Sequence, residues 1–500
     1  MATSVHVLAR ARLVLGHGTT LGTLMGDLAE VHGNRRLLTD QAGGQLTYHQ
    51  AAKRVNRWAA GIGARTAPGD RVVINTTNNY EQFLLCLAAS RAGCIAAPVN
   101  PQMRAEEVAH VVADAGAALV VRSVHQVDHP EPMAEAAPAA ADDIAALFYT
   151  SGTTGVPKGA ELSHRALIGQ ATTGALWTPA LHRDENLFSL PIAHIMGFTV
   201  LVGMACLGVP TYLIPRFRPT DVLDAIEERR CTVFIGVPAM YRMLAEAGAA
   251  DRDLTSVRLW GSGADAMPAD LARQFKKMGA TVTLPVLGPV GEATFVEGYG
   301  MVEVGGGVAA KVSPPLIDLG LGDGLGLQLP GYHFKVVDGD DHEVRPGAEG
   351  ELWVRGPGVI RGYWNAPETN ERTVTADGWL RTGDLVRRGP FGTVVFVGRQ
   401  KDVIKHAGYS VYAREVQEAL ERHPSVLEAA VVGLPDPTKG EVPVAVVRLV
   451  DGADLDELDL GTWASQHLSA YKVPRRILAV DEMPRTGTNK LARTELRDLF

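Results

Sequence analysis

Residues Tyr149–Ala160 read YTSGTTGVPKGA, a stretch with three glycines, four serine or threonine hydroxyls and one lysine. Glycine backbone amides can turn inward around an anion, and hydroxyls and an ammonium group add donors and positive charge. The stretch therefore predicts a phosphate-binding loop. Its expected phosphate ligands are Thr150, Ser151, Gly152, Thr153, Thr154, Gly155 and Lys158.

The spacing of this loop excludes the commonest phosphate-binding motif. A P-loop requires Gly, four residues, and then Gly-Lys-Ser/Thr. Counting from Gly152, Pro157 stands where the second glycine belongs, and Gly159 follows Lys158 where a hydroxyl residue is required. A P-loop ATPase is therefore rejected.

Length and composition limit the class of protein. The chain has 500 residues, of which 46% are hydrophobic and 21% charged, and its formal net charge is -8. Such a length predicts at least two domains, and the acidic balance argues against a nucleic-acid partner. The four cysteines lie in apolar surroundings without metal-ligand spacing, which predicts buried thiols in a reducing cytoplasm.

The pattern of apolar residues predicts an α/β fold. Compact β-branched runs at 70–76, 118–123, 231–238 and 280–287 alternate with amphipathic stretches such as the helix expected at 219–230. Strands that alternate with helices favour a mainly parallel sheet covered on both faces. The Ala/Pro-rich segment 129–143 lacks any period and is predicted to be a loop.

The character of the chain changes after about residue 325. Short strands separated by Gly and Asp turns predict antiparallel β structure up to about residue 400. The remaining residues predict a small α+β domain, with helices at 413–422 and 460–469 and strands at 427–432 and 442–449. We therefore place a domain boundary near Lys401.

One apolar stretch has the length of a membrane span. Residues 195–214 carry no charge over about 20 residues, the length that crosses a bilayer. Glycines and Pro210 interrupt the stretch, and its end is typical of a strand. We therefore expect a buried helix, a turn and a core strand, without a transmembrane span. The N-terminus does not resemble a signal peptide.

Five later segments extend the interpretation of the phosphate loop. They are EGYGMVE (Glu297–Glu303), GELWVRGPGVIRGYW (Gly350–Trp364), GWLRTGDL (Gly378–Leu385), GRQKDVIKHAGYSVYAREVQ (Gly398–Gln417) and PRTGTNKL (Pro484–Leu491). With YTSGTTGVPKG, this ordered set resembles the signature of the adenylate-forming superfamily. That superfamily contains acyl-CoA and aryl-CoA synthetases, peptide-synthetase adenylation domains and firefly luciferase.

The resemblance implies a fold and a reaction. The expected fold is a large N-terminal domain (1–400) of βαβ-type parallel sheets with a small β-barrel-like subdomain (about 325–400), and a small mobile α+β C-terminal domain (401–500). The expected enzyme is most like a bacterial AMP-forming fatty acyl-CoA synthetase. It joins a hydrophobic acid to ATP as acyl-adenylate, releases pyrophosphate, and passes the acyl group to coenzyme A.

The resemblance also assigns residues to the nucleotide. Lys490 is expected to bridge the acid carboxylate and the α-phosphate, and Glu303, aided by Thr150, to bind Mg²⁺. Asp384 is expected to accept both ribose hydroxyls, with Arg399 nearby. The adenine is expected between two segments, whose residues are Gly263, Ala264, Asp265, Tyr299 and Gly300.

Further roles concern the second half-reaction. Lys401 is expected to be the hinge about which the C-terminal domain rotates after adenylation. This rotation removes Lys490 from the site and brings in Gly408 and Tyr409 to line a channel for coenzyme A. Motion of a domain about one or a few residues is physically ordinary.

An apolar slot is expected for the acid. His194, in LPIAHIMGF, resembles the histidine that borders the acyl pocket in acyl- and aryl-CoA synthetases, and a helix-capping role is the alternative. Gly197, Val237 and Gly298 are expected to line the slot. This segment has no aspartate for an α-amino group, which disfavours an amino-acid substrate.

Three departures from the superfamily pattern keep alternatives open. Val302 replaces a threonine, Asn489 replaces a glycine, and the segment 281–300 is about ten residues longer than expected. A lost hydrogen bond to a charged group costs about 1.5–3 kcal/mol, enough to slow adenylation about tenfold or more. The alternatives are a fatty acyl-AMP ligase that delivers to a carrier protein, and an acyl- or nucleotide-binding pseudoenzyme. Peripheral membrane contact and a homodimer also remain open.

Overall fold

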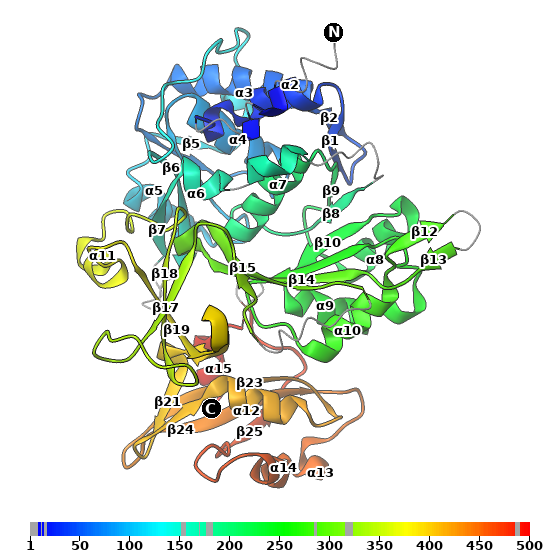
Figure 1. The fold of residues 1–500 in the computed structure, drawn as a ribbon, viewed down its shortest axis with the longest axis vertical. Coiled ribbons are helices and arrows are strands. Elements are labelled where there is room, and N and C mark those ends of the chain that lie inside the picture. The colour runs from blue at the N-terminus through cyan, green and yellow to red at the C-terminus, as the bar shows by residue number, and fades with distance from the viewer. Residues whose placement is uncertain are drawn as a thin grey trace. The chain divides into compact units, whose positions relative to one another are not determined.

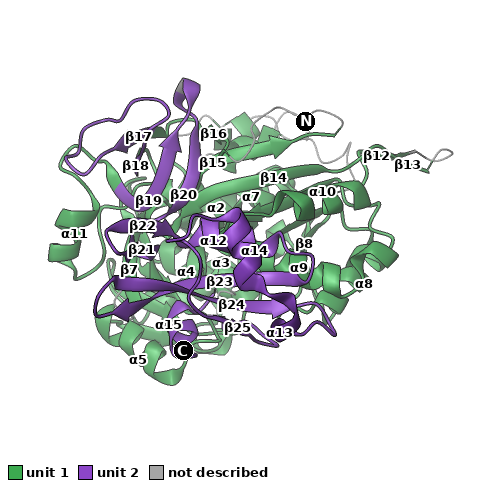
Figure 2. Cartoon of the chain, turned by 90° about the horizontal axis from the view of Figure 1, so that it is seen from below, with its two compact units in different colours: residues 1–333, 354–380 green, residues 334–353, 381–500 purple. Residues whose placement is uncertain are grey.

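The computed structural model describes residues 9–11, 13–14, 18–151, 157–169, 171–176, 184–284, 288–315, 324–485 and 491–500. The chain forms two compact units (Figure 2). The first comprises 1–333 and 354–380, and the second comprises 334–353 and 381–500. Much of the segment with predicted antiparallel strands thus groups with the C-terminal residues. The domain boundary near Lys401 stays a prediction.

One sheet of the first unit carries the phosphate loop. It has five strands in the order β5–β3–β4–β6–β7, parallel except for the β6–β7 pair. The strands are β3 (Arg71–Ile74), β4 (Ile95–Pro98), β5 (Leu119–Val121), β6 (Ile144–Ser151) and β7 (Pro157–Ser163). The predicted strands at 70–76 and 118–123 are confirmed as β3 and β5.

The other large sheet of this unit has nine strands among the described residues, in the order β16–β15–β14–β11–β10–β8–β9–β1–β2. Its central pairs, from β14 to β1, are parallel. The strands are β1 (Arg36–Asp40), β2 (Gln45–Thr47), β8 (Asn186–Phe188), β9 (Thr211–Leu213), β10 (Val233–Gly236), β11 (Leu259–Gly263), β14 (Thr294–Met301), β15 (Gly306–Ser313) and β16 (Leu327–Gln328).

Ten α-helices of the first unit are described. They are α2 (Leu21–His32), α3 (Tyr48–Gly63), α4 (Tyr80–Arg91), α5 (Ala105–Asp114), α6 (His164–Ile168), α7 (Ile195–Leu207), α8 (Pro219–Arg229), α9 (Pro238–Glu246), α10 (Ala269–Met278) and α11 (Pro367–Thr373). Helices α2, α3 and α4 pack together at one end of the unit (Figure 1). The predicted helix at 219–230 is confirmed as α8.

Local sequence explains where these helices begin and end. Thr47 caps α3, because its hydroxyl accepts the Gln50 amide while the Gln50 side chain accepts the Thr47 amide. Gly208 ends α7 in the left-handed conformation, at φ +70°. The predicted helix, turn and strand of 195–214 are therefore α7, Gly208 and β9. Across the described residues, no helix combines the length and apolar character needed to span a bilayer.

The prediction of a parallel-sheet strand at 280–287 is wrong. β12 (Val282–Leu284) pairs antiparallel with β13 (Gly288–Val290) in a separate two-stranded sheet, and β14 joins the parallel sheet instead. Gly288 and Gly291 adopt left-handed φ values of +73° and +76°, which turn the chain before β14. The longer segment before Tyr299 thus forms, in its described part, a β-hairpin.

The second unit contains two sheets. The first has the order β17–β18–β19–β20, and its β19–β20 pair is antiparallel, as predicted. The second comprises β22–β21–β24–β23, with β25 beside β24. The strands are β17 (His333–Val337), β18 (Glu349–Arg355), β19 (Leu380–Arg388), β20 (Val394–Arg399), β21 (Val403–His406), β22 (Tyr409–Tyr412), β23 (Val426–Asp436), β24 (Gly440–Leu449) and β25 (Ile477–Ala479).

The predicted α+β pattern of the C-terminal residues is confirmed. The helices are α12 (Ala413–Glu421), α13 (Leu455–Leu458), α14 (Leu460–His467) and α15 (Arg493–Arg497). Alternate residues of β23 divide between two hydrophobic clusters: Ala429 and Val431 pack with α12 and α14, whereas Ala430 and Val432 pack with Leu496 of α15. The sheet is therefore covered on both faces.

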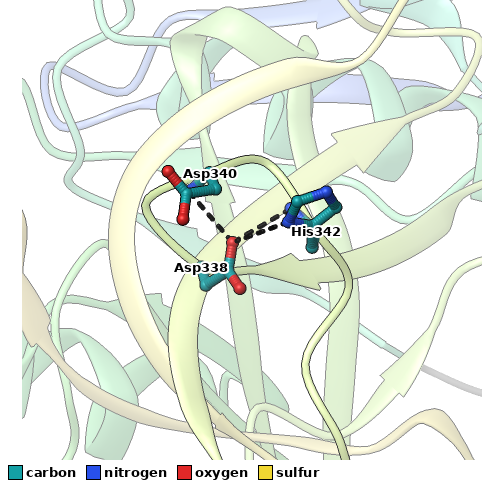
Figure 3. A group of neighbouring side chains, drawn as sticks. All are labelled: Asp338, Asp340 and His342. Carbon is teal, nitrogen blue, oxygen red and sulfur yellow. Dashed lines mark hydrogen bonds and ion pairs between the residues drawn. The ribbon is translucent and has the colours of Figure 1, made fainter.

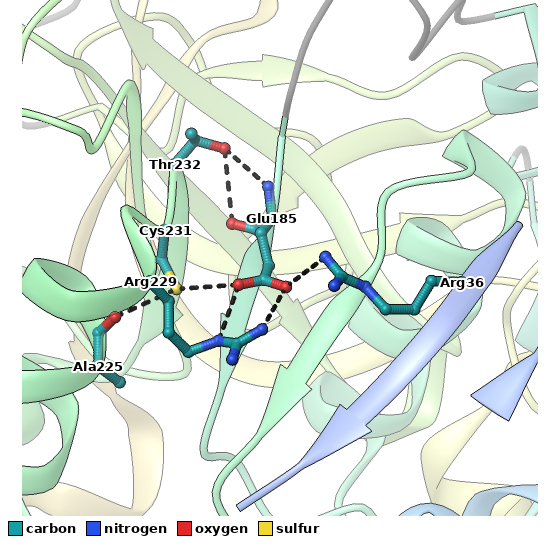
Figure 4. Close-up of polar contacts among 6 residues, drawn as sticks. All are labelled: Arg36, Glu185, Ala225, Arg229, Cys231 and Thr232. Atoms are coloured by element: carbon teal, nitrogen blue, oxygen red, sulfur yellow. Dashed lines mark hydrogen bonds and ion pairs between the residues drawn. The ribbon is translucent and has the colours of Figure 1, made fainter. Parts of the chain in front are cut away.

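A buried carboxylate ties together several strands of the nine-stranded sheet (Figure 4). Glu185 is 2.8 Å from the Arg36 guanidinium and makes two hydrogen bonds to Arg229, at 2.8 and 2.9 Å. Its backbone amide donates to Thr232 Oγ1 at 3.1 Å. Two arginines balance the burial of the charge, which an unpaired carboxylate could not tolerate.

All four cysteines are free and buried, as predicted. Burial raises the pKa of Cys206 and of Cys231 to about 12. The thiols are therefore protonated at neutral pH and pack as small apolar groups.

His164 links α6 to the start of α2. Its Nδ1 accepts the backbone N–H of Leu21 at 3.2 Å, and the ring is buried. Burial lowers the pKa of His164 below its ordinary value of 6.5, and Asp143 opposes this only in part. A protonated ring would also lose the hydrogen bond and face the positive end of α2.

We expect His164 to make the fold less stable in acid. Below pH about 6.5 the unfolded chain binds a proton at His164 that the folded chain resists, so stability falls by up to about 1.4 kcal/mol per pH unit. Because Asn retains an acceptor without titrating, His164→Asn should flatten this decline between pH about 7.5 and about 5.5, measured by hydrogen exchange of α2. An unchanged slope would contradict the assignment.

Candidate functional site

The phosphate-binding stretch forms a β-hairpin in the first unit. β6 and β7 place Thr150 opposite Lys158, and the backbone of Ser151 opposite Pro157. The pairing fixes both ends of the loop, so Thr150 and Lys158 stand at its base. The predicted residues Gly152, Thr153, Thr154 and Gly155 lie outside the described part of the chain, as does the Ser151 side chain.

Lys158 contacts the segment around α11. Its Nζ donates to Thr369 Oγ1 at 3.1 Å and lies 6.0 Å from the centroid of the Tyr363 ring. An ammonium near an aromatic face is attracted by the quadrupole of the ring. The cation at the base of the loop is therefore held by two residues that the sequence interpretation did not single out.

Glu303 contacts the same tyrosine. It lies in a 3₁₀ turn (Val302–Val304) directly after β14, and its Oε1 accepts the Tyr363 hydroxyl at 2.6 Å. The Glu303 carbonyl accepts the Ile360 amide at 3.0 Å. Tyr363 is thus in contact with both the predicted phosphate cation and the predicted metal ligand.

The two predicted metal ligands carry donor atoms that suit a magnesium ion. Glu303 and Thr150 offer a carboxylate and a hydroxyl, and hard oxygen donors are those that Mg²⁺ prefers. A carboxylate has about four acceptor positions, so one hydrogen bond from Tyr363 leaves others for an ion. The residues therefore fit the predicted ion in chemical type.

The two segments predicted to hold adenine lie side by side. β11 and β14 are parallel neighbours, with Gly263 opposite Gly298. Ligands of open α/β sheets bind beyond the carboxyl ends of such strands. Ala264, at the end of β11, has a φ of +69°, a strained value for a residue with a side chain. Asp265 follows it and is exposed.

Gly300 is required by a close approach of two strands. The pairing of β14 with β15 shifts between Tyr299 and Gly300. A Cβ on Gly300 would lie 1.8 Å from the carbonyl oxygen of Gly306, whereas a Cβ on Gly298 would meet nothing nearer than 3.9 Å. The glycine of the Tyr-Gly element therefore keeps Glu303 in place through packing.

Val302, which replaces the usual threonine, is part of the core. It is 9% exposed and belongs to the main hydrophobic cluster of the unit. A threonine here would bring its hydroxyl into that cluster, where a hydroxyl without a partner costs about 1–3 kcal/mol. The valine is consistent with its surroundings.

The residues predicted for the acyl slot occupy two helix starts and a strand end. His194 caps α7, since its Nδ1 accepts the Met196 amide at 3.3 Å, and Val237 precedes α9. Gly197 has no space for a side chain, because a Cβ would lie 2.1 Å from the Pro191 carbonyl oxygen. The capping role that was the alternative for His194 is thus observed, and a role at the acid stays a prediction.

An apolar cavity of about 230 Å³ lies behind the Glu303 turn. Its lining includes Leu167, Thr199, Gly305, Gly307, Leu329 and Tyr332. Neither His194, Gly197, Val237 nor Gly298 lines it. Sequence interpretation missed this cavity because its walls come from five separate parts of the chain, the fifth being Pro357.

In the second unit, Asp384 and Arg399 face each other across β19 and β20. They are register partners, and Arg399 Nε is 2.9 Å from Asp384 Oδ1. Asp384 is buried, and its backbone amide donates to Thr382 Oγ1 at 3.0 Å. The resemblance assigns both residues to the ribose of ATP. Their proximity is compatible with that role, which stays a prediction.

The hinge and channel residues belong to a hairpin of the second unit. Lys401 is exposed in a short turn before β21. Ala407 and Gly408 join β21 to β22 with φ values of +50° and +84°, the geometry of a tight two-residue hairpin loop. Tyr409 is 56% exposed and stacks on Tyr471 at 4.5 Å between ring centroids.

Tyr471 was not predicted, and no motif in the sequence marks it.

Lys490 and Asn489 lie outside the described residues.

A cluster of three metal-type side chains lies in the turn after β17 (Figure 3). Asp338 Oδ1 accepts the backbone amides of Asp340 and His342, each at 3.0 Å, and lies 3.9 Å from His342 Nδ1. All three residues are exposed. Because the carboxylate closes the turn, we assign the cluster a structural role.

The β6–β7 hairpin, the Glu303 carboxylate after β14 and the glycines at the ends of β11 and β14 are features expected of an α/β nucleotide-binding enzyme. The family models agree: "AMP-binding enzyme" matches residues 27–364, and "AMP-binding enzyme C-terminal domain" matches residues 415–490. The chain therefore belongs to the AMP-binding, adenylate-forming family.

Individual relatives cover nearly the whole chain. A feruloyl-CoA synthase from an Amycolatopsis species is 33% identical over 493 residues, covering 92% of this chain and 94% of the relative. The fatty acid–[acyl-carrier-protein] ligase ScoC from Streptomyces coeruleorubidus is 31% identical over 497 residues, covering 92% of each. ATP-bound MatB from Rhodopseudomonas palustris superimposes with a TM-score of 0.83 at 28% identity, covering 96% and 99%.

These matches confirm the predicted class and fold. The chain is an AMP-forming acid–thiol ligase of the CoA-ligase type. ATP and coenzyme A are its substrates, and Mg²⁺ is its cofactor. A large domain with parallel sheets and a small C-terminal domain is the fold of the related structures.

Gly300→Ala is expected to destabilise the first unit by about 3 kcal/mol, because the new methyl group would overlap a backbone carbonyl. Thermal unfolding of the variant measures this effect. Gly298→Ala, two residues earlier on the same strand, is the matched control and should change stability by less than about 0.5 kcal/mol. Equal effects of the two substitutions would contradict the close approach at Gly300.

Proposed function

We propose that this enzyme activates a hydrophobic carboxylic acid, with a fatty acid as the first candidate, and transfers the acyl group to coenzyme A. The observation that supports the proposal is the position of Tyr363, which donates a hydrogen bond to Glu303 and has its ring near Lys158. We propose these two residues as the metal ligand and the phosphate cation. The acid carboxylate attacks the α-phosphorus of ATP, and pyrophosphate leaves. The thiol sulfur then attacks the acyl carbon, and AMP leaves.

The first step requires cations because it brings two anions together. Unit charges a few ångströms apart repel by several kcal/mol even at an effective dielectric constant near 20. We propose that Lys158 grips the β- and γ-phosphates and that Lys490 bridges the acid and the α-phosphate. Mg²⁺, held by Glu303 and Thr150, would neutralise further phosphate charge. Such fixed charges act where negative charge develops.

The remaining roles concern the nucleoside and the thiol. We propose that Asp384, with Arg399, accepts the ribose hydroxyls, and that adenine stacks beside Gly263–Asp265 and Tyr299–Gly300. Gly408 and Tyr409 would line the thiol channel after rotation about Lys401. A cytoplasmic location, a peripheral membrane contact and a dimer stay predictions.

Our proposal that the acid is hydrophobic is based on small and apolar residues near His194. Gly197, Val237 and Gly298 would border an apolar slot next to His194. The relatives include enzymes named for an aromatic acid and for a fatty acid, which supports a hydrophobic acid in general. The fatty acid is our first candidate because the residues proposed to border the slot beside His194 are small or apolar.

A carrier protein is the second candidate acceptor. ScoC, with 31% identity, is named for transfer to an acyl carrier protein. The acid would then pass from AMP to the thiol of a phosphopantetheine arm instead of free coenzyme A. Both acceptors carry the same thiol, so the chemistry of the second step is unchanged.

The test is a pyrophosphate-release screen over acids from acetate to long-chain and aromatic, with and without coenzyme A. We expect release with hydrophobic acids and an acyl-CoA product by mass. Trapped acyl-AMP that is consumed only by a phosphopantetheinylated carrier protein would favour the second candidate. Absence of release with every acid would overturn the proposal in favour of a binding-only protein.

Lys490→Ala should lower the rate of ATP–pyrophosphate exchange with a productive acid by about 100-fold or more, because a cation that stabilises the transition state is removed. Lys277→Ala, at an exposed position of α10, is the control and should leave exchange unchanged. Retained exchange in the Lys490 variant would remove its assigned role.

Lys401→Pro should spare exchange and slow thioester formation, because proline fixes the backbone angle φ about which the hinge would turn. Lys401→Ala removes the same side chain without this restriction and should retain both half-reactions. The two half-reactions are followed separately by exchange and by acyl-CoA formation. If they fell equally in the proline variant, Lys401 would not be the hinge.

A further inference from the structure

Tyr363 lies next to two residues with different proposed roles, the magnesium ligand Glu303 and the phosphate-binding Lys158. Its hydroxyl donates to Glu303 Oε1 at 2.6 Å, and its ring lies 6.0 Å from Lys158 Nζ. The hydroxyl of this one side chain therefore binds an anionic group, while its aromatic ring lies near a cationic one. Sequence interpretation gave Tyr363 no role, although it lies in GELWVRGPGVIRGYW.

The backbone of this segment is fixed on the same two elements. The Trp364 amide donates to the Gly159 carbonyl at 2.7 Å, and the Glu161 amide donates to the Gly362 carbonyl at 3.0 Å, so both flanks of Tyr363 pair with β7. On the other side, the Ile360 amide donates to the Glu303 carbonyl at 3.0 Å. The backbone around Tyr363 is thus paired both with β7 and with the turn that carries Glu303.

We propose that Tyr363 is a positioning residue that orients the Glu303 carboxylate for the magnesium ion bound with ATP. The inference rests on the proposed function, because it assumes that Glu303 is the metal ligand. A hydrogen bond to Oε1 fixes the plane of the carboxylate and directs its remaining lone pairs. Outer partners of this kind typically contribute 10–100-fold to metal affinity.

A neighbouring tyrosine provides a matched control. Tyr332 also donates a hydrogen bond beside this turn, but to the backbone carbonyl of Val304, at 3.2 Å. Its burial raises its pKa to about 12, so its hydroxyl is neutral. Tyr→Phe at either position removes one hydroxyl and retains the ring. Only the change at Tyr363 releases a carboxylate.

The experiment measures ATP binding by calorimetry to the full chain, in Mg²⁺ and in EDTA, without an acid. We expect Tyr363→Phe to reduce the gain in ATP affinity due to Mg²⁺ about tenfold and to leave the affinity in EDTA unchanged. Tyr332→Phe should match the wild type under both conditions. An unchanged Mg²⁺ gain in Tyr363→Phe, or an equal loss in Mg²⁺ and EDTA, would overturn the inference.

The two proposals can fail separately. A wild-type chain that binds ATP with the expected dependence on Tyr363 but releases pyrophosphate with no acid supports the inference and overturns the proposed function. If the wild type and Tyr363→Phe both release pyrophosphate and reach half-maximal release at the same Mg²⁺ concentration, only the inference about Tyr363 is overturned.

Discussion

The parallel pairing of β11 with β14 is the constraint on which the first unit depends. It brings Gly263, the last residue of β11, opposite Gly298, and β14 continues from there to the turn that carries Glu303. The turn stays there because Gly300 has no side chain, so β15 can approach more closely than a Cβ atom would allow. The carboxylate of Glu303 is thus located by backbone packing, and the hydrogen bond from Tyr363 bears on its orientation.

Glu303 differs from two other acidic residues, Glu185 and Asp384, in the charge of its partner. In the first unit, Glu185 is buried and forms ion pairs with two arginines, Arg36 and Arg229. Glu303 instead makes a hydrogen bond to a neutral phenol, which orients the carboxylate without neutralising it. In the second unit, Asp384 is paired with Arg399 across a strand pair. Glu303 is thus the one of these three whose hydrogen bond comes from a tyrosine hydroxyl and not from an arginine.

Motifs and hydrophobic periods predicted much of this molecule. The strands β3, β5 and β10, the helices α8 and α12, and the end of α7 at Gly208 follow from apolar patterns and from glycine chemistry. The strand expected at 280–287 was wrong, because β propensity alone does not distinguish a sheet strand from a hairpin strand. The contacts of Tyr363 and Thr369 with Lys158 join residues about 200 apart, and no local pattern encodes them.

The division of the chain has a practical consequence for protein fragments. Strands β17, β18, β19 and β20 form one sheet that ends at Arg399. A fragment that stops after residue 400 keeps this sheet whole. A fragment that stops at residue 380 removes β20 and nearly all of β19, and leaves β18 with an open edge of unpaired backbone amides and carbonyls, the type of edge from which aggregation spreads. Limited proteolysis would therefore yield a well-behaved N-terminal piece only where cleavage falls beyond Arg399.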